Sequence, residues 1–301
     1  MATDVLTEAS AIASDHDAGA AELVARLLPL LETAIAHGPD LTRSVAQIVC
    51  AGQPAMASLW HACAAAIAAL EAPGQFARMR AQLARAPAAL QRAASLALHD
   101  LLDDASPQIV TLSFSSSLAA VLQDVARTRS GPEPSRGALR VVCGEGRPRF
   151  EGRRMAAALA AAGLEVTVAT DAALTTCLTR ASTVMVGADA IADSFWINKT
   201  GTHGLVSVAN RLGVPVYVVA SRDKAMPPAL AARWRLPEAA APEVWPDAPG
   251  HIRVLNRYFE PIPAELVTLF LTDAGPVAPE HLPAFVASGA APLSRLLEMM
   301  S

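Results

Sequence analysis

Long apolar runs are missing from this sequence of 301 residues, which excludes a membrane span. Apolar residues make up 52% of the chain, but many are alanines, and only 4% of the residues are aromatic. The longest nearly uncharged run, residues 56–70, is shorter than the roughly 20 residues of a helix that crosses a bilayer. Residues 1–18 carry Asp4, Glu8, Asp15 and Asp17 where a signal peptide has a basic and then an apolar stretch. We therefore expect a cytoplasmic protein with no membrane partner.

Paired cysteines and a basic surface are also missing. The four cysteines form no C-x-x-C pair and no zinc-ligand spacing, so the sequence predicts neither a disulfide framework nor a metal site. A formal net charge of −4 leaves no basic face large enough for nucleic-acid binding as the main activity. The G-x-G at residues 144–146 lacks the spacing and the following acidic residue of a dinucleotide fingerprint. We expect no metal, no NAD or other cofactor, and no nucleic-acid partner.

What is present in the first third of the chain is helical periodicity. Apolar residues recur at helical spacing over residues 20–37, 41–50, 56–70 and 74–100, and Pro39, Pro54 and Pro73 stand near the breaks. No strand pattern interrupts these segments. The sequence therefore predicts an all-helical N-terminal domain, residues 1–105.

After Pro107 the pattern changes to short β-branched runs that alternate with alanine-rich helical segments. The expected strands are residues 109–112, 139–143, 165–169, 183–186, 214–219, 252–255 and 266–271. Such alternation is typical of an α/β fold, a parallel sheet with crossover helices. We assign residues 106–301 to this second domain, with proline-rich surface loops at residues 130–136 and 227–249.

In an open parallel sheet, ligands bind outside the carboxyl ends of the strands. The first expected strand ends in Ser113, which is followed by Phe114 and the serine turn, residues Ser115, Ser116 and Ser117. The hydroxyl and backbone N–H groups of such a turn, at the start of a helix, suit a phosphate. The alternative is plain helix capping by serine.

Two further strand ends add charge to the same edge. The strand at 183–186 leads to Asp189, and nine residues later a loop carries Asn198 and Lys199 beside a glycine that leaves backbone donors accessible to an oxyanion. A structural salt bridge between Asp189 and Lys199 is the alternative. The strand at 214–219 leads to Lys224, a second cation. The sequence thus predicts a pocket for a phosphorylated ligand around these residues.

The strand at 139–143 ends in Cys143, and Arg147 follows shortly after it. Arg147 precedes a proline, which favours an extended backbone from which its side chain could reach the pocket. Arg153 and Arg154 lie on the next helix, and their pattern favours a solvated face. Cys143 is a candidate nucleophile or base if nearby arginines lower its pKa; the alternative is an inert buried cysteine.

Six motifs in order resemble one superfamily. They are E-x-R-P-x-x-x-G at residues 145–152, D-A-A at 171–173, G-A-D at 187–189, N-K-x-G-T at 198–202, P-V-Y-V at 215–218 and L-T-D-x-G at 271–275. Together they are similar to the superfamily that unites the alpha, beta and delta subunits of translation initiation factor 2B with methylthioribose-1-phosphate isomerase and ribose-1,5-bisphosphate isomerase.

The resemblance implies a Rossmann-like second domain, dimerisation through it, and a sugar-phosphate pocket. In the isomerases an aspartate acts as acid while a cysteine moves hydrogen between neighbouring carbons, which opens an aldose phosphate and forms a ketose. Asp189 matches the acid, and Asn198 and Lys199 match the pair that holds the ligand. The serine turn matches the phosphate-binding turn, and Lys224 matches a further phosphate contact.

Several positions depart from the pattern. The catalytic cysteine position is occupied by Ser113, a poor base unless something activates it. Gln53 replaces an arginine, the Arg-Gly pair of the N-terminal domain is replaced around residues 18–19, and Glu151 replaces a glutamine with a charge that repels phosphate. We expect a homodimeric protein that binds a small phosphorylated sugar or nucleotide. The alternative is an active aldose–ketose isomerase that uses Asp189 as acid with Ser113 or Cys143 in place of the usual cysteine.

Overall fold

The computed structural model describes residues 2–72, 74–102, 107–129, 137–227, 230–231, 236–290, 293 and 296. The expected boundary between residues 105 and 106, the loop at 130–136 and Pro73 lie outside these described residues. None of the described helices is long and apolar enough to cross a membrane.

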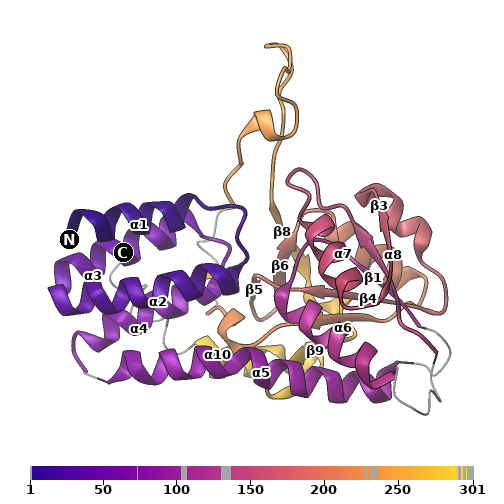
Figure 1. Ribbon diagram of the computed structural model, residues 1–301, viewed down its shortest axis with the longest axis horizontal. Coiled ribbons are helices and arrows are strands. Elements are labelled where there is room, and N and C mark those ends of the chain that lie inside the picture. The colour runs from indigo at the N-terminus through magenta and orange to yellow at the C-terminus, as the bar shows by residue number, and fades with distance from the viewer. Residues whose placement is uncertain are drawn as a thin grey trace.

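The N-terminal part of the chain forms a layered group of helices at one end of the molecule (Figure 1). They are α1 (Ala2–Ser14), α2 (Ala20–His37), α3 (Pro39–Gly52), α4 (Ala57–Ala69) and α5 (Gln75–Leu101). Leu23, Leu27 and Leu31 of α2 repeat every fourth residue and are fully buried, which explains why this segment forms an amphipathic helix. Helix α4 is buried on all sides, because its alanines let the neighbouring helices approach closely.

The four predicted helices are all present. Their ends differ from the predicted ends by at most two residues, and both ends of α2 are where they were predicted. Helix α1 was missed, because only three of its residues, Val5, Ala9 and Ile12, are buried, and its other residues are mostly polar or small. Its apolar face is narrow but still packs on α3 and α2.

The second part of the chain is a doubly wound α/β unit, as predicted. Its seven-stranded sheet has the order β10-β9-β7-β4-β1-β2-β3, and only β10 is antiparallel to its neighbour. The strands are β1 (Gln108–Thr111), β2 (Arg140–Gly144), β3 (Glu165–Ala169), β4 (Ser182–Gly187), β7 (Val216–Val219), β9 (Leu269–Thr272) and β10 (Gly275–Val277).

Helices cover both faces of this sheet (Figure 1). The core on one face includes residues of α6 (Ser116–Arg129), α7 (Glu151–Ala161) and the second half of α5. The core on the other face includes residues of α8 (Thr202–Arg211) and α10 (Leu282–Ala290). The first half of α5 packs in the helical core, with Phe76 and Leu83 buried there. One long helix therefore fixes the helical part against the sheet.

A small antiparallel sheet was not predicted. It has the order β5-β6-β8, with β5 (Ala190–Ile191), β6 (Phe195–Lys199) and β8 (Phe259–Pro263). Asn198 and Lys199 are therefore not in a loop, as the glycine that follows them had suggested, but at the end of β6, paired with Glu260 and Phe259 of β8. Strand pairing across about 60 residues of sequence has no local signal.

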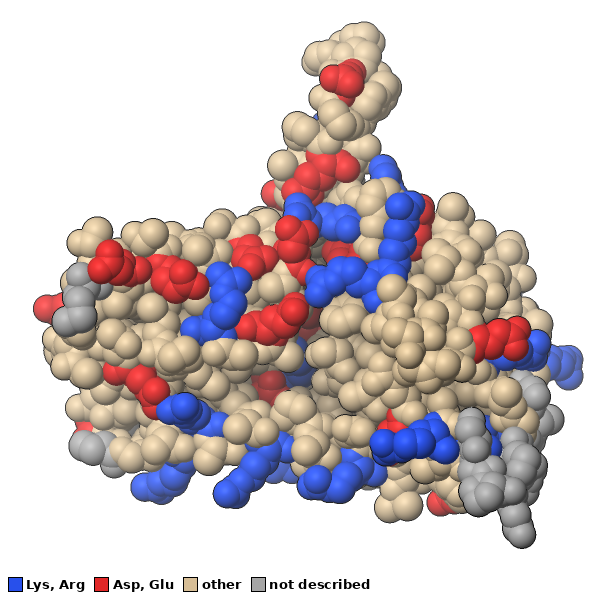
Figure 2. Space-filling model, viewed as in Figure 1, with Lys and Arg blue, Asp and Glu red and all other residues tan. Residues whose placement is uncertain are grey.

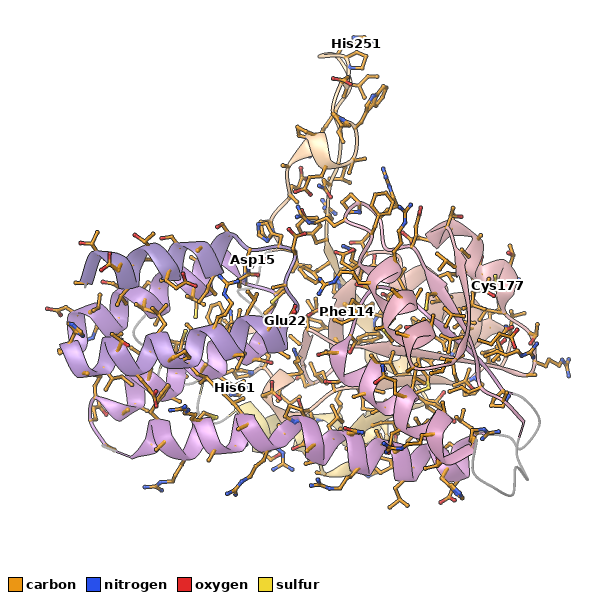
Figure 3. All side chains as sticks on the ribbon, viewed as in Figure 1. Asp15, Glu22, His61, Phe114, Cys177 and His251 are labelled. Atoms are coloured by element: carbon orange, nitrogen blue, oxygen red, sulfur yellow. The ribbon has the colours of Figure 1, made fainter. Side chains whose placement is uncertain are left out.

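The predicted strand at residues 252–255 is wrong. These residues belong to an arm, residues 239–256, that projects from the body of the molecule (Figure 1), with His251 near its tip (Figure 3). A hydrogen bond from the Ala239 N–H to the Asn256 carbonyl closes its base at 2.9 Å. Ile252 and Leu255 are 41% and 52% exposed. The segment has β-branched and apolar residues, but it lies away from the sheet and pairs with none of the described strands.

Candidate functional site

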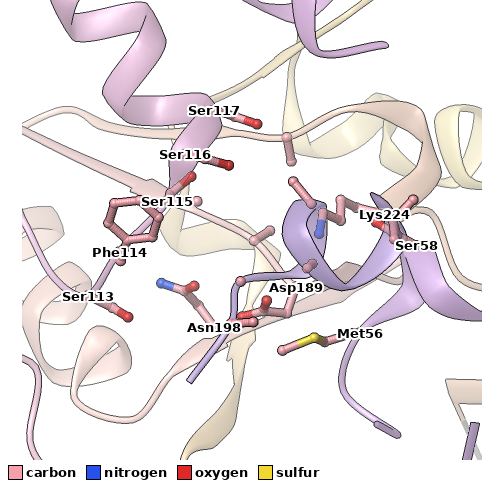
Figure 4. Close-up of a pocket in the computed structure, with 18 of the residues that line it drawn as sticks. Met56, Ser58, Ser113, Phe114, Ser115, Ser116, Ser117, Asp189, Asn198 and Lys224 are labelled. Atoms are coloured by element: carbon pink, nitrogen blue, oxygen red, sulfur yellow. The ribbon is translucent and has the colours of Figure 1, made fainter. Parts of the chain in front are cut away.

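A pocket lies where the helical part meets the carboxyl edge of the large sheet (Figure 4). Its cavity has a volume of about 180 Å³, which is small beside the about 300 to 1,000 Å³ of pockets for drug-sized ligands. Both parts of the chain line it, and positive and negative side chains mix at its rim (Figure 2). The geometry suits a small polar ligand.

Four helices begin at this pocket. It is lined by the first residues of α2 (Ala20 and Ala21), by Ser58 near the start of α4, by the serine turn at the start of α6 and by Glu151 at the start of α7. The N-terminus of a helix carries unpaired backbone N–H groups and a partial positive charge, so each one favours an anion. Their convergence brings backbone N–H donors to the pocket that no single motif in the sequence reveals.

The structure brings the predicted serines to this site. The hydroxyl of Ser115 accepts a hydrogen bond from the Leu118 N–H at 3.2 Å, so Ser115 caps α6. Ser116 and Ser117 also line the pocket (Figure 4). Gly187 makes room for the turn, because a Cβ atom on it would lie 2.8 Å from the Ser115 hydroxyl. The capping alternative therefore applies to one serine and leaves the other two hydroxyls beside the cavity.

Ser113 also lines the pocket, with an unusual backbone conformation. Its φ angle of 70° lies in the left-handed region, where residues other than glycine are strained. Such strain is typical of residues that the surrounding structure holds in place next to a ligand.

Asp189 follows β4 and stands at the junction of the two parts of the chain. Its N–H donates to the Ile197 carbonyl at 2.9 Å, and its carbonyl accepts from the Ala57 N–H at 3.1 Å. Burial raises the pKa of the Asp189 carboxyl above its ordinary value; Lys224 and Lys199 oppose this shift and Glu151 adds to it. The pocket thus holds a carboxyl group that keeps its proton to a higher pH than an exposed aspartate does.

Lys199 does not pair with Asp189, contrary to one alternative from the sequence. Its Nζ atom lies 2.7 Å from Oε1 of Glu151, and the two side chains are only 4% and 16% exposed. Its neighbour Asn198 donates from Nδ2 to the Thr202 hydroxyl at 3.1 Å, which fixes the turn that ends β6. The charge of Lys199 is therefore already balanced by a carboxylate.

Lys224 lines the pocket from the short 3₁₀ helix η2 (Arg222–Lys224) after β7, and in Figure 4 Asp189 stands between it and Asn198. Among the residues that the structure describes, it has no salt-bridge partner. The neighbouring Asp223 accepts hydrogen bonds from the hydroxyls of Ser58 and Ser221. Burial opposes ionisation of Asp223, but Lys224 and these two hydroxyls outweigh it and lower the pKa of this carboxyl below its ordinary value.

Two predicted site residues lie outside the pocket. Cys143 is fully buried in the core beneath α5, α6 and α7, and burial raises the pKa of its thiol to about 12. It therefore has neither access to a ligand here nor the thiolate form that a nucleophile needs. Arg147 points to the arm, where its guanidinium donates to the Val244 carbonyl at 3.3 Å.

Arg154, interpreted from the sequence as part of a solvated face, is exposed as expected and also lines the pocket. Its guanidinium lies 4.8 Å from the centre of the Phe114 ring, donates to the Asp17 carbonyl at 2.7 Å and donates to the Glu22 carboxylate at 3.4 Å. The spacing held a signal, because Arg154 is three residues after Glu151 and lies on the same face of α7.

A second missed signal is lysine usage. The chain contains two lysines, Lys199 and Lys224, and both line this pocket, while its other strongly basic side chains are arginines.

Gln53, at the position of an expected arginine, donates from Nε2 to the carbonyls of Ile12, Ala13 and Asp15. It ties α1 to the end of α3 and adds no positive charge. Within the described residues no group of His, Cys, Asp or Glu side chains is placed to hold a metal ion.

Comparison with known proteins points to one family. The model of the initiation factor 2 subunit family matches residues 42–279. The chain belongs to this family. The resemblance expected from the six motifs is therefore confirmed, and the family is related to sugar-phosphate isomerases.

Relatives of this family member carry different names. A putative translation initiation factor eIF-2B subunit 2-like protein of Pyrococcus abyssi is 30% identical over 80% of this chain and 82% of its own. A ribose 1,5-bisphosphate isomerase of Methanocaldococcus jannaschii is 32% identical over 47% of each chain, so the match spans about half of that relative. A structure of the Pyrococcus horikoshii translation initiation factor eIF-2B covers 92% of this chain and 97% of its own, with a TM-score of 0.76 and 24% identity, which shows the fold.

Proposed function

We propose that this family member binds a small phosphorylated sugar or nucleotide in the pocket, with the phosphoryl group at Lys224 and the serine turn. The observation that carries this proposal is the convergence of four helix N-termini on a cavity that also holds Lys224, which has no salt-bridge partner among the described residues. Helix N-termini supply backbone donors, and Lys224 supplies a full charge, so both favour a phosphate.

The small cavity supports a ligand of sugar size. Asn198, Asp189 and Ser113 line it together with the serine turn (Figure 4), and all three can exchange hydrogen bonds with hydroxyl groups. A sugar carries one hydroxyl on most of its carbons, so this mixed set of donors and acceptors matches it. Names of relatives that refer to ribose and methylthioribose phosphates add support.

A thermal-shift panel of pentose phosphates and nucleotides, followed by calorimetry, tests the proposal. We expect at least one compound to raise the melting temperature, and Lys224→Ala to weaken its binding by about 1.5 to 3 kcal/mol, the range for hydrogen bonds to charged groups. Arg253→Ala on the exposed arm is the matched control and should bind normally. If no compound in the panel binds the unmodified protein, the proposal is wrong.

A second candidate function is isomerisation, and the state of Asp189 favours it. A carboxyl group whose pKa is raised by burial can donate a proton to a ring oxygen and so help to open a sugar ring. Cys143 has no part in this version, because it lies outside the pocket. Proton NMR of the same panel should then show a ketose product, and Asp189→Asn should abolish it. Conversion that persists in this variant would contradict the mechanism.

The homodimer implied by the family resemblance and the cytoplasmic location expected from the sequence stay predictions. Light scattering on the purified protein tests the first, with an expected mass of twice the 31.2 kDa of one chain.

A further inference from the structure

The two lysines of the pocket are in different electrostatic states. Lys199 is buried and ion-paired, whereas Lys224 is partly exposed and has no carboxylate at salt-bridge distance in the described part of the chain. A ligand with negative charge at both ends would need a free cation at each end of the cavity. Of the two lysines, only Lys224 meets this requirement in the described part of the chain.

Lys199 is held from two sides. Besides the 2.7 Å contact with Glu151, its Nζ atom lies 4.9 Å from the centre of the Tyr258 ring, which adds a cation–π contact. Separating a buried ion pair leaves an uncompensated charge, which is strongly unfavourable. A ligand that pulled Lys199 away from Glu151 would therefore have to offset this cost.

Glu151 also repels an anion directly. Its second carboxylate oxygen, Oε2, is buried and accepts no hydrogen bond from any described residue. A phosphoryl group beside Lys199 would lie next to this carboxylate, and like charges brought together at a binding site are costly. A neutral hydroxyl group avoids the repulsion, because Lys199 still has N–H donors to offer it.

Resting on the function proposed above, we propose that Glu151 restricts the pocket to ligands with a single phosphoryl group. The phosphoryl group is bound at Lys224 and the serine turn, and the uncharged hydroxylated end lies against Lys199 and Glu151. The ligand class is a monophosphorylated sugar or nucleoside, and a bisphosphate is excluded. Glu151 is thus a specificity-determining residue of this chain.

Calorimetry with two matched pairs tests the inference: ribose 5-phosphate against ribose 1,5-bisphosphate, and adenosine 5′-monophosphate against adenosine 3′,5′-bisphosphate. For the pair that binds, we expect the unmodified protein to prefer the monophosphate by about tenfold or more. Glu151→Gln should remove this preference by strengthening bisphosphate binding about tenfold, because Lys199 becomes a free cation. Glu145→Gln is the matched control, since Glu145 pairs with Arg153 outside the pocket, and it should keep the preference.

Two further measurements separate charge from folding. Glu151→Asp keeps the negative charge and should keep the preference for the monophosphate. Selective ¹³C labelling of lysine gives signals from only two lysines, so the ligand should shift the Lys224 signal strongly and leave Lys199 nearly unchanged. This spectrum and the ligand preference are both measured on the unmodified protein, so they do not depend on whether a variant folds.

The outcomes distinguish this inference from the function on which it rests. Equal or tighter binding of the bisphosphate by the unmodified protein, or an unchanged preference in a folded Glu151→Gln protein, overturns the role of Glu151 but leaves phosphate binding intact. Failure of every phosphorylated compound to bind overturns the proposed function and this inference together.

Discussion

The two walls of the pocket differ in what they contribute. The wall from the α/β part carries both lysines, the serine turn and Asp189, and so supplies most of the charge and the polar side chains. The wall from α2, α3 and α4 supplies helix N-termini and side chains such as Met56 and Gln53. The difference indicates that the sheet edge sets the chemistry of the site, while the helices close it and shape it.

Contacts across the pocket hold the two walls together. Asp189 accepts from the Ala57 N–H, Asp223 accepts from the Ser58 hydroxyl, and the ring Nε2 of the buried His61 lies 2.8 Å from the Ala225 carbonyl. All the helical partners lie in the first two turns of α4. The position of this one helix therefore sets the width of the pocket.

The largest expected effect comes from weakening the core behind the helical wall. Leu59 of α4 is fully buried, and Leu59→Ala should lower the free energy of unfolding by about 2 to 5 kcal/mol, since it leaves a cavity. Urea unfolding measures this loss. Leu96→Ala is the control, because Leu96 is 73% exposed, and its effect should stay within about 0.5 kcal/mol. If the comparison of the walls is right, folded Leu59→Ala protein still binds phosphate through Lys224.

A smaller effect should follow from breaking a link between the walls. Asp223→Asn removes the charge that the hydroxyls of Ser58 and Ser221 stabilise, and we expect a loss of about 1 to 3 kcal/mol at pH 7. The native pKa of Asp223 is lowered, so its stabilising effect is complete above the unfolded value of about 4 and disappears as the pH falls through the native value.

Thermal midpoints of the two proteins measured from pH 7 down to pH 2 check this prediction. The difference between them should be constant above about pH 4 and should shrink at lower pH. Asp247→Asn, on the exposed arm, serves as control and should show no such difference. A difference that grows on acidification would contradict the lowered pKa.

The sequence predicted the two walls unequally well, for a physical reason. Ser115, Asp189 and Lys224 were found because the ends of parallel strands converge at one edge, a rule that needs no knowledge of distant contacts. The N-termini of α2 and α4 could not be placed there, since their position depends on packing between segments far apart in the sequence. The Glu151–Lys199 pair also joins residues 48 positions apart, and it decides what Lys199 can bind.

The fold shows the same division. The helix over residues 20–37 and the strand over 165–169 were predicted to their ends from local periodicity. Local periodicity did not predict the small sheet of β5, β6 and β8, nor the arm. A strand forms only where a partner strand pairs with it, and residues 252–255 have no such partner among the described residues. Cys143 was a candidate because it stands near the end of a strand, but it is buried in the core and does not line the cavity.

The smallest expected effect concerns Ser113, where stability and binding should change in opposite directions. Its φ of 70° is strained for serine but accessible to glycine, so Ser113→Gly should raise the free energy of unfolding, by at most about 1 kcal/mol after the extra chain entropy of glycine is subtracted. Ser117, in the first turn of α6, has no such strain, so Ser117→Gly should lower the free energy of unfolding by up to about 1 kcal/mol.

Ligand affinity completes the test of Ser113. If its hydroxyl contacts the ligand, Ser113→Gly should weaken binding by about 0.5 to 1.5 kcal/mol while the protein itself becomes more stable. Urea unfolding and calorimetry on the same sample measure both changes. A variant that is more stable and binds equally well would show that the strain at Ser113 shapes the turn before α6 without serving the ligand. Opposite signs would show that the sheet-edge wall holds a strained residue in place for binding.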